Sequence, residues 1–460
     1  MYKLVLYPLR RTFSTSISKL SHSVPKSLEI NGVSYQSDPN FTNVTESILN
    51  LTDRSLHLNE SHPIGILRNI IEHRFNSLPG SHFATFNHFK PIVTKWQNFD
   101  SLGFPKDHPG RSVSDTYYIN GETLLRTHTS AHEQECFHSI KENNEEAFLI
   151  SADVYRRDEI DRTHYPVFHQ MEGAHLWGRS SEELHHLEKS IKELEQLLKN
   201  YTTKIVVKEA DPFDDSTRQP YMTNKEALLC EAHLKRSLEL IVAEVFSKKI
   251  ESMKLKKSTE IPDSLQVRWV TTTFPWTTPS WEIEVWWNND WLEICGCGVV
   301  KEQVLRNAGY KADSKIGWAF GLGLDRIAML LFEIPDIRLL WTKDERFHKQ
   351  FKKGEITTFK PYSKYPGTLR DVAFWLPDTS EKFKEIHEND IMEIVRNIAG
   401  DLVESVKLTD EFLHPKTHRK SLCYRINYQS MDRNITNAEI NDLQNKVNHE
   451  LVSKYGVELR

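Results

Sequence analysis

No apolar run in this 460-residue sequence reaches the length of a membrane-spanning helix, so the sequence predicts no membrane segment. A surplus of basic residues is also missing: 59 Lys and Arg stand against 64 Asp and Glu, a formal charge of -5. This balance argues against a surface coated in positive potential, although a nucleic acid needs only a local basic patch. Cysteine is scarce, and an odd number of five indicates reduced thiols.

The composition is that of an ordinary folded protein. With 38% hydrophobic and 27% charged residues, a chain of 460 residues can form two or three domains with substantial cores. Cys295 and Cys297 have a single residue between them, a spacing that fits neither a zinc knuckle nor a redox pair. We therefore expect both cysteines to be packing residues.

The first 28 residues lack acidic side chains and are rich in serine and threonine. Their basic residues are Lys3, Arg10, Arg11, Lys19 and Lys26. This composition, without the continuous apolar core of a secretory signal, is typical of a mitochondrial transit peptide and predicts import into the mitochondrial matrix. A basic tail on a cytosolic protein is the alternative.

Three stretches of the chain carry candidate chemistry: Asp153–Asp158, His164–Glu172 and Gly317–Arg326. The first contains Arg156, and the third ends in an arginine. An arginine stays charged and meets phosphate oxygens two at a time, so two of them can hold a bent ATP chain. With an aromatic residue and a paired amide and carboxylate in the second stretch, these residues offer what a site that activates an amino acid with ATP requires.

We expect a strand, a loop and a second strand around Arg156. Residues 147–155 are apolar and β-prone, and residues 166–171 resume that character after a charged turn at residues 158–162. Arg156 would then stand on a sheet.

The second strand would present three functional side chains. Phe168 could stack on a nucleobase. Gln170 and Glu172 are two residues apart and so lie on one face of a strand, where they could receive an α-ammonium group.

Gly321-Leu-Gly323 resembles the start of a dinucleotide fingerprint, but an arginine replaces its third glycine and no βαβ pattern follows. An arginine that opens the apolar helix 327–332 fits better. At that position the helix N-terminus and the guanidinium of Arg326 both favour an anion such as the γ-phosphate.

The stretch around Arg156 resembles motif 2, and the stretch that ends in Arg326 resembles motif 3, of class II aminoacyl-tRNA synthetases. Further stretches are similar to phenylalanyl-tRNA synthetases, above all to the single-chain mitochondrial form: Asn98–Leu102, His108–Arg111, Asp115–Tyr118, Leu125–Ser130 and Trp291–Gly298. The likeness covers roughly residues 40–460 apart from a variable middle insert.

The resemblance implies a ligase that uses ATP, Mg²⁺ and phenylalanine and charges mitochondrial tRNA(Phe), as a monomer. It implies that Arg156 steadies the α-phosphate and that His164 and Arg326 hold the outer phosphates. The nucleotide site would also contain Asp158 at the adenine amine, Phe168, and Glu293 acting through Mg²⁺. Glu293 could instead be a strand residue that faces solvent.

The resemblance also implies an amino-acid site in which two aromatic residues and the small Ala319 select the ring. Its members would be His128, Ser130, Ala131, His132, Glu133, Thr163, Tyr165, Gln170, Met171, Glu172, Phe274, Trp276, Ala319 and Phe320. The spacing of His128, His132 and Cys136 would also suit zinc on a helix, but the segment resembles a substrate loop.

The fold implied is α+β: a class II antiparallel sheet flanked by helices, followed by a ferredoxin-like β-α-β-β-α-β anticodon-binding domain. Helical spacing at residues 62–75 and a strand at residues 89–93 with Pro91 resemble motif 1. Capping boxes at Ser180–Glu183 and Thr223–Glu226 predict two helices, which are either scaffold or a tRNA contact. The expected parts are 1–28 transit peptide, 29–345 catalytic domain with a helical insert at about 180–260, 346–363 linker and 364–460 anticodon-binding domain.

RNA contact in the slightly acidic C-terminal domain must depend on a local cluster. The dense candidate is Lys416, His418, Arg419, Lys420 and Arg425, although a solvated charged turn would look the same. Two rival functions are a paralogue that only binds RNA and a ligase of the same fold for another amino acid. The presence of Arg156, Arg326 and the Gln170 and Glu172 pair argues against the first, and Phe274 and Trp276 argue against the second.

Overall fold

The computed structural model describes residues 26–30, 32–210, 215–255, 262–361, 365–377 and 386–460. Most of the expected transit peptide lies outside the described residues, and strand β1 begins at Ser27, inside its expected end. No helix in the described ranges is long and apolar enough to cross a membrane.

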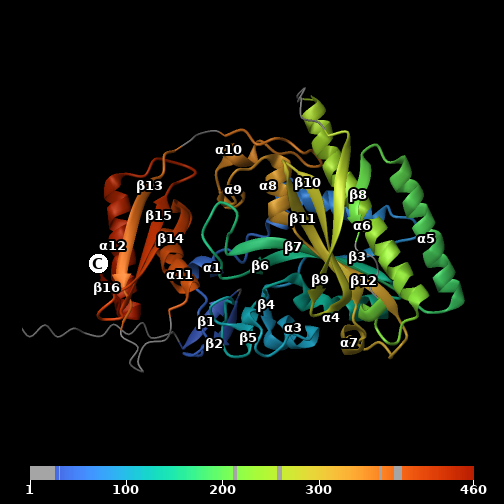
Figure 1. Ribbon diagram of the computed structural model, residues 1–460, viewed down its shortest axis with the longest axis horizontal. Coiled ribbons are helices and arrows are strands. Elements are labelled where there is room, and N and C mark those ends of the chain that lie inside the picture. The colour runs from blue at the N-terminus through green and yellow to red at the C-terminus, as the bar shows by residue number, and fades with distance from the viewer. Residues whose placement is uncertain (1–25, 31, 211–214, 256–261, 362–364, 378–385) are drawn as a thin grey trace, which may run out of the picture.

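An eight-stranded sheet forms the centre of the larger unit (Figure 1). Six neighbouring strands pair antiparallel, as expected, while the edge strands β3 and β8 pair parallel with β6 and β9. In sheet order the strands are β3 (Phe83–Phe86), β6 (Ala147–Tyr155), β7 (Val167–Trp177), β12 (Ile316–Gly323), β11 (Asp290–Val300), β10 (Thr277–Trp287), β9 (Ser264–Phe274) and β8 (Lys204–Ala210).

Helices α2 (Pro63–Asn76), α6 (Asn224–Leu255) and α8 (Leu324–Phe332) pack on the sheet and bury the main apolar core. Aromatic side chains join the layers: the rings of Phe75 on α2 and Phe320 on β12 stack 4.9 Å apart. The burial of these large rings contributes about 2 to 3 kcal/mol each.

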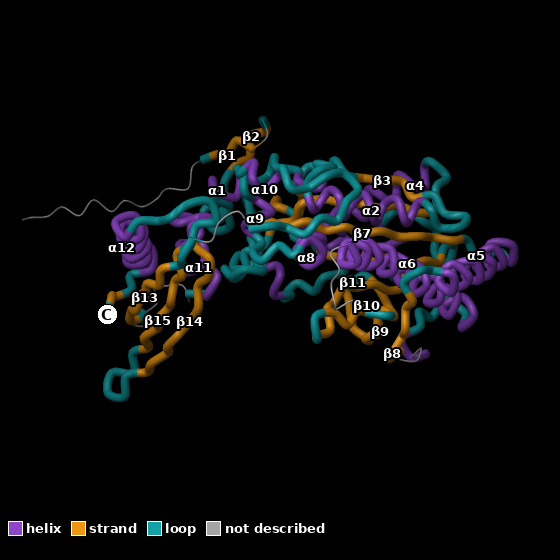
Figure 2. The backbone as a smooth tube through the Cα atoms, turned by 90° about the horizontal axis from the view of Figure 1, so that it is seen from above, coloured by secondary structure: helices purple, strands orange, loops and turns teal. Residues whose placement is uncertain are grey.

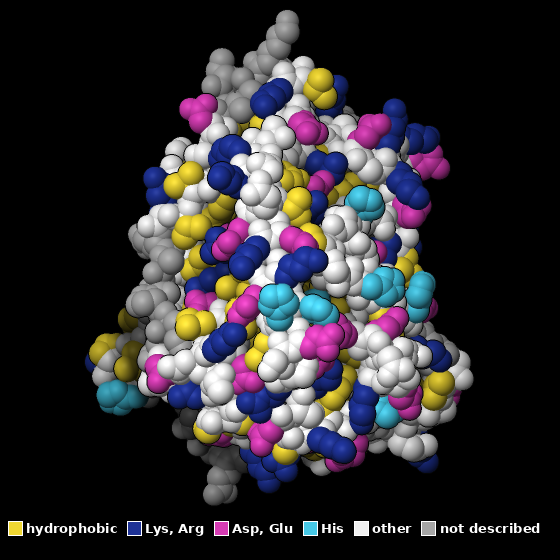
Figure 3. Space-filling view, turned by 90° about the vertical axis from the view of Figure 1, so that its right-hand side faces the viewer, with side chains coloured by type: hydrophobic (Ala, Val, Ile, Leu, Met, Phe, Trp, Pro, Cys, Tyr) yellow, Lys and Arg dark blue, Asp and Glu magenta, His cyan; other side chains and the backbone are white. Residues whose placement is uncertain are grey.

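The predicted capping boxes start α5 (Ser181–Asn200) and α6. Alongside α6, α5 forms one flank of the molecule, and Figure 3 shows basic and acidic side chains interspersed on that side. Lys225 and Glu188 form an ion pair of 2.6 Å between the two helices. The mixed charge and the burial of α6 in the core favour the scaffold interpretation of this segment.

The remaining elements before the C-terminal unit are short. The predicted strand at residues 89–93 is β4, which begins only at Ile92, after Pro91, whose nitrogen carries no hydrogen to donate. The others are β1 (Ser27–Ile30), β2 (Val33–Gln36), α1 (Glu46–Leu49), α3 (Lys95–Asn98), β5 (Thr123–Leu125), the 3₁₀ turn Thr129–His132, α4 (Glu133–Glu142), α7 (Glu302–Asn307), α9 (Arg338–Trp341) and α10 (Glu345–His348).

The C-terminal unit has the predicted β-α-β-β-α-β order and its own apolar core. Its sheet runs β14-β15-β13-β16, and two helices cover one face (Figure 2). The elements are β13 (Thr368–Trp375), α11 (Glu388–Ala399), β14 (Val403–Leu413), β15 (Lys420–Tyr428), α12 (Asn437–Tyr455) and β16 (Glu458–Leu459).

The catalytic and C-terminal units are in direct contact. Within the expected linker, residues 346–363, the described residues Phe347, Phe351 and Phe359 pack against the catalytic core. The loop between β6 and β7 contacts the C-terminal unit, where Arg157 donates to Asp390 at 3.0 Å. A loop that carries predicted site residues therefore lies against the anticodon-binding fold.

Candidate active site

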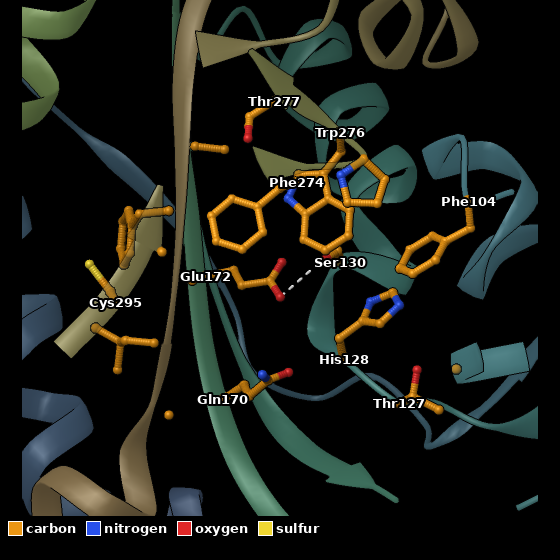
Figure 4. A pocket seen from close by; sticks show the side chains of 18 of the residues that line it. Phe104, Thr127, His128, Ser130, Gln170, Glu172, Phe274, Trp276, Thr277 and Cys295 are labelled. Atoms are coloured by element: carbon orange, nitrogen blue, oxygen red, sulfur yellow. Dashed lines mark hydrogen bonds between the residues drawn. The ribbon is translucent and has the colours of Figure 1, made fainter. Parts of the chain in front are cut away.

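A cavity of about 680 Å³ lies against the sheet where β7, β11 and β12 run side by side. Figure 4 shows side chains from these strands and from the segment before α4 pointing into it. The predicted site residues that line it are His128, Ser130, Glu133, Arg156, Asp158, Gln170, Glu172, Phe274, Trp276, Glu293, Ala319 and Phe320. Residues predicted from distant parts of the sequence thus share one cavity.

One end of the cavity can receive an ammonium group. Gln170 and Glu172 point from β7 as predicted (Figure 4), and the Ser130 hydroxyl donates to the Glu172 carboxylate at 2.8 Å. The backbone amide of Thr129 donates to the side-chain oxygen of Gln170 at 3.3 Å. Burial raises the pKa of Glu172 to about 7, although the hydrogen bonds from Thr129 and Ser130 oppose this rise.

A second buried carboxyl lies near Glu172. Glu133, the first residue of α4, is 3% exposed and also lines the cavity. Burial, and then the charge of Glu172, raise the pKa of Glu133 well above its ordinary value. Burial and this repulsion therefore favour the protonated form of Glu133, which can donate a hydrogen bond, while Glu172 is the carboxyl that can carry the negative charge.

Aromatic side chains form the opposite wall. The ring centres of Phe274 and Trp276 lie 5.9 Å apart. The rings of His128, Trp276 and Phe104 form a cluster in which each centre lies 5.5 to 5.8 Å from the other two. Burial and nearby Arg156 lower the pKa of His128 to about 3, so the imidazole is neutral. This wall suits an apolar ring, with Ala319 leaving space beside it.

Phe104 was not predicted from the sequence. It lies in an irregular segment far from the motifs, and the stretch Asn98–Leu102 that ends just before it was the nearest signal. Gly296 was also missed: a Cβ atom there would lie 2.4 Å from the Phe274 ring, so only glycine leaves this ring in place.

Arg156 directly follows β6, whose bounds match the strand expected at residues 147–155. Its Nε donates to the carbonyl of Thr127 at 2.8 Å, which fixes the direction of the guanidinium. The guanidinium carbon is 5.1 Å from the Phe168 ring centre. A cation and an aromatic face thus lie side by side at the cavity, an arrangement that suits a nucleotide.

Arg326 is exposed in the first turn of α8, just past the cavity-lining Gly323. Its neighbour Asp325 is buried and accepts a hydrogen bond of 2.6 Å from the backbone amide of His169 on β7. This contact ties the start of α8 to β7, which carries Gln170 and Glu172.

Eight residues predicted for the amino-acid and nucleotide sites lie outside the lining of this cavity, among them Phe168 and Arg326. His164 and Tyr165 line a separate cavity of about 160 Å³ at the junction with the C-terminal unit. His164 Nδ1 lies 2.9 Å from an Asp161 oxygen, and His132 stacks on Phe89 at 4.3 Å. The others are Ala131 and Met171, which are buried, and the exposed Thr163.

The zinc alternative gains no support within the described ranges. His132 is engaged by Phe89 and by Arg126, whose guanidinium lies 3.1 Å from its Nε2, while Cys136 is buried in an apolar cluster. Cys295 and Cys297 are buried free thiols, as expected.

Three carboxylates gather on β10 and β11. Glu293 lines the cavity and pairs in register with Glu284, and burial together with Glu293 and Glu284 raises the pKa of Glu282. Glu282 and Glu284 were missed, although their spacing of two within a strand places them on one face. A cation would relieve the repulsion between these carboxylates.

The predicted basic cluster lies on the β14–β15 hairpin, and acids offset part of its charge. Arg425 is held by both oxygens of Asp371 at 2.7 and 2.8 Å, Lys420 pairs with Glu411 at 3.0 Å, and Arg419 pairs with Glu458 at 2.8 Å. Lys416 and His418 are exposed in the hairpin turn.

Two family models match the chain. One, described as tRNA synthetases class II core domain (F), matches residues 49–250 and 211–351, and the other, described as a ferredoxin-fold anticodon binding domain, matches residues 363–460. The chain is 62% identical over 446 residues to "Phenylalanine--tRNA ligase, mitochondrial" of Saccharomyces cerevisiae, with 94% of this chain and 95% of the relative covered. The chain belongs to the phenylalanine–tRNA ligase family.

More distant members of the phenylalanine–tRNA ligase family match over a similar length. The relative from Mus musculus, "Phenylalanine--tRNA ligase, mitochondrial", is 41% identical, and the alignment covers 94% of this chain and 89% of the length of the relative. The chloroplastic/mitochondrial phenylalanine–tRNA ligase of Arabidopsis thaliana is 42% identical, and the alignment covers 94% of this chain and 85% of the length of that relative.

Proposed function

We propose that this chain attaches phenylalanine to mitochondrial tRNA(Phe) in the mitochondrial matrix, acting as a monomer. In the first step a carboxylate oxygen of phenylalanine bonds to the α-phosphorus of ATP, and the bond to pyrophosphate breaks. In the second step a hydroxyl of the terminal tRNA ribose attacks the carbonyl carbon of the adenylate, and AMP leaves. The observation that carries this proposal is the single cavity that joins an ammonium site, an aromatic wall and Arg156.

The ammonium group of phenylalanine would bind at Glu172, with Gln170 and Ser130 beside it. The hydroxyl of Ser130 fixes one carboxylate oxygen, so the other oxygen can face the ligand. The ring of phenylalanine would then pack against Phe274 and Trp276, and the carboxylate of phenylalanine would point towards Arg156, which lines the same cavity.

The ATP chain would bind along the Arg156 side of the cavity. Arg156 would spread the charge that develops on the α-phosphate as the carboxylate attacks, which is electrostatic catalysis. The adenine would stack on Phe168, with Asp158 at its amine, and Arg326 would hold the outer phosphates at the start of α8. The third phosphate ligand that we propose is His164, which lies in the same loop between β6 and β7.

Mg²⁺ would bind beside the phosphates. Glu293 fits this role because it lines the cavity and lies among carboxylates whose mutual repulsion a cation would reduce. Bound there, the ion would neutralise charge on the leaving pyrophosphate.

Phenylalanine-dependent exchange between ATP and pyrophosphate tests this proposal, with the other amino acids tested in parallel. We expect exchange with phenylalanine and its loss in Arg156→Ala. Arg306→Ala, which removes an exposed arginine from α7, is the matched control and should leave exchange unchanged. Exchange that requires another amino acid would identify a different ligase, and no exchange with any amino acid would favour the RNA-binding paralogue.

A further inference from the structure

The turn that carries Trp276 is not held by regular strand pairing. On β10, Thr278 and Pro279 stand opposite the single residue Val299 of β11, and β9 shows the same interruption on its side of β10. A bulge of this kind breaks the hydrogen-bond ladder and turns the neighbouring side chains. The direction in which Trp276 enters the cavity therefore depends on other contacts (Figure 4).

Lys301 supplies two of these contacts from outside the cavity. Its ammonium group donates to the carbonyl of Pro275 at 2.6 Å, and its backbone amide donates to the carbonyl of Trp276 at 2.9 Å. Both carbonyls of the turn are thus bound by Lys301, which directly precedes α7. Lys301 is not among the described residues that line the cavity, so it can act on a ligand there only through the turn.

The bond from Lys301 to Pro275 takes the place of an ion pair. Burial lowers the pKa of the half-buried Lys301, and no carboxylate among the described residues opposes this shift. An ammonium group that is partly removed from water loses free energy unless acceptors around it replace the water. The carbonyl of Pro275 is such an acceptor, and a hydrogen bond from a charged donor is stronger than one between neutral groups.

Helix α7 also holds the segment that leads to Phe104, another aromatic side chain of the wall. Asn307, the last residue of α7, donates from its side-chain amide to the carbonyl of Ser101 at 2.8 Å. Trp276 packs against an apolar cluster that contains Val304 of α7. Two parts of the aromatic wall that come from distant segments are therefore fixed by one short helix and the lysine before it.

We propose that Lys301 is a positioning residue that sets the selectivity of the cavity for the phenylalanine ring, because it fixes the turn that carries Trp276. This inference rests on the proposed function, in which the ring packs against Phe274 and Trp276. An apolar pocket rejects a ring with an added hydroxyl only about a hundredfold. A wall that can shift gives up this discrimination, so the support of the wall decides how much of it remains.

The test measures kcat/KM in ATP–pyrophosphate exchange with phenylalanine and with tyrosine. Lys301→Met keeps the apolar stem and loses the donor, and we expect kcat/KM for phenylalanine to fall about 10- to 100-fold as the wall is displaced. The preference for phenylalanine over tyrosine should fall at least about fivefold, because the displaced wall leaves room for the hydroxyl. The KM for ATP should change little. Lys301→Arg keeps a charged donor and should preserve the preference.

The preference separates positioning from misfolding. A partly unfolded variant loses activity with phenylalanine and with tyrosine by the same factor, so its preference stays constant. Lys301→Gln, which keeps a polar side chain without the charge, replaces Lys301→Met if the methionine variant does not fold, and it should show the same fall in preference. Lys311→Met removes an exposed lysine shortly after α7 and is the matched control, which should behave like the unchanged chain.

Two results would overturn the inference about Lys301. One is an unchanged preference in Lys301→Met or in the glutamine variant that replaces it, and the other is a loss in Lys301→Arg as large as in that variant. Absence of exchange with phenylalanine in the unchanged chain would instead overturn the proposed function itself.

Discussion

The hydroxyl of Ser130 donates to the buried carboxylate of Glu172 at 2.8 Å, which ties the turn before α4 to strand β7. A hydrogen bond to a charged group contributes about 1.5 to 3 kcal/mol. We therefore predict that Ser130→Ala lowers kcat/KM for phenylalanine about 10- to 100-fold and leaves the KM for ATP nearly unchanged.

Pyrophosphate exchange at varied phenylalanine and ATP concentrations measures both constants. Ser61→Ala, at an exposed position before α2, is the control for the loss of a hydroxyl. Equal changes in the constants for phenylalanine and ATP would show that Ser130 does not act through the ammonium site.

The carboxyl of Glu172 should make kcat/KM for phenylalanine depend on pH. The pKa of Glu172 is raised to about 7 by burial, so its negative charge is lost as the pH falls through about 7. Because that charge binds the ammonium group, kcat/KM for phenylalanine should fall on the acid side of this value. Glu172→Gln should lower kcat/KM at every pH and remove this acid limb from the profile.

Replacement of Glu133 should affect kcat/KM much less than replacement of Glu172. The pKa of Glu133 is raised well above the ordinary value by burial and by the charge of Glu172, and both effects favour its protonated form. Glu133→Gln replaces a neutral acid by a neutral amide of the same shape and should retain kcat/KM at pH 7 within about threefold. A loss as large as that in Glu172→Gln would show that Glu133 is the charged partner.

The predictable parts of the molecule were those set by local spacing. The box of Ser180 and Glu183 predicted the start of α5, because both hydrogen bonds join residues three apart. Gln170 and Glu172 were placed on one face of β7 by alternation alone. The C-terminal element order was confirmed for the same reason, since each helix and strand there has its own period.

What the sequence did not predict depends on contacts between distant segments. Phe104 reaches the cavity from an irregular segment, and no period marks it. The pairing of Arg425 with Asp371 follows from the register of β13 against β15, which fixes the charge of the hairpin face. The burial of Phe359 in the catalytic core was not predicted either, because the apolar residues in 346–363 do not recur at helical or strand spacing.

Gly296 leaves the aromatic wall in place, so its substitution should act on phenylalanine selectively. An added Cβ would lie 2.4 Å from the Phe274 ring and push that ring into the cavity. We predict that Gly296→Ala raises the KM for phenylalanine about 5- to 150-fold, since overpacking of this kind costs about 1 to 3 kcal/mol. The KM for ATP should change little.

Steady-state measurement of ATP–pyrophosphate exchange gives the KM values for phenylalanine and ATP, with Gly121→Ala as the control. There the added carbon would meet only the end of the Asp38 side chain at 3.3 Å and the Phe41 ring. If Gly296→Ala keeps the KM for phenylalanine, the ring does not bind beside Phe274.

The junction between the two units depends on a buried ion pair. Arg396 donates to Glu393 at 2.6 Å and to the carbonyl of Asp158 at 2.6 Å, and Tyr117 donates to the same carboxylate at 2.9 Å. Arg396→Met leaves the charge of Glu393 buried without its closest cation. Breaking one side of such a pair costs about 3 to 5 kcal/mol, so we predict a loss of that size in the free energy of unfolding, measured by urea titration.

The double variant Arg396→Met with Glu393→Gln shows why Arg396→Met loses stability. It removes the stranded charge but leaves the shape of the junction, so it should recover more than half of the loss, as replacement of both partners of a buried pair often costs little. If the double variant is as unstable as Arg396→Met, the loss comes instead from the broken contact with the Asp158 carbonyl. In that case the loop between β6 and β7 is held by Arg396 directly, and the KM for ATP should rise in both variants because Asp158 lines the cavity.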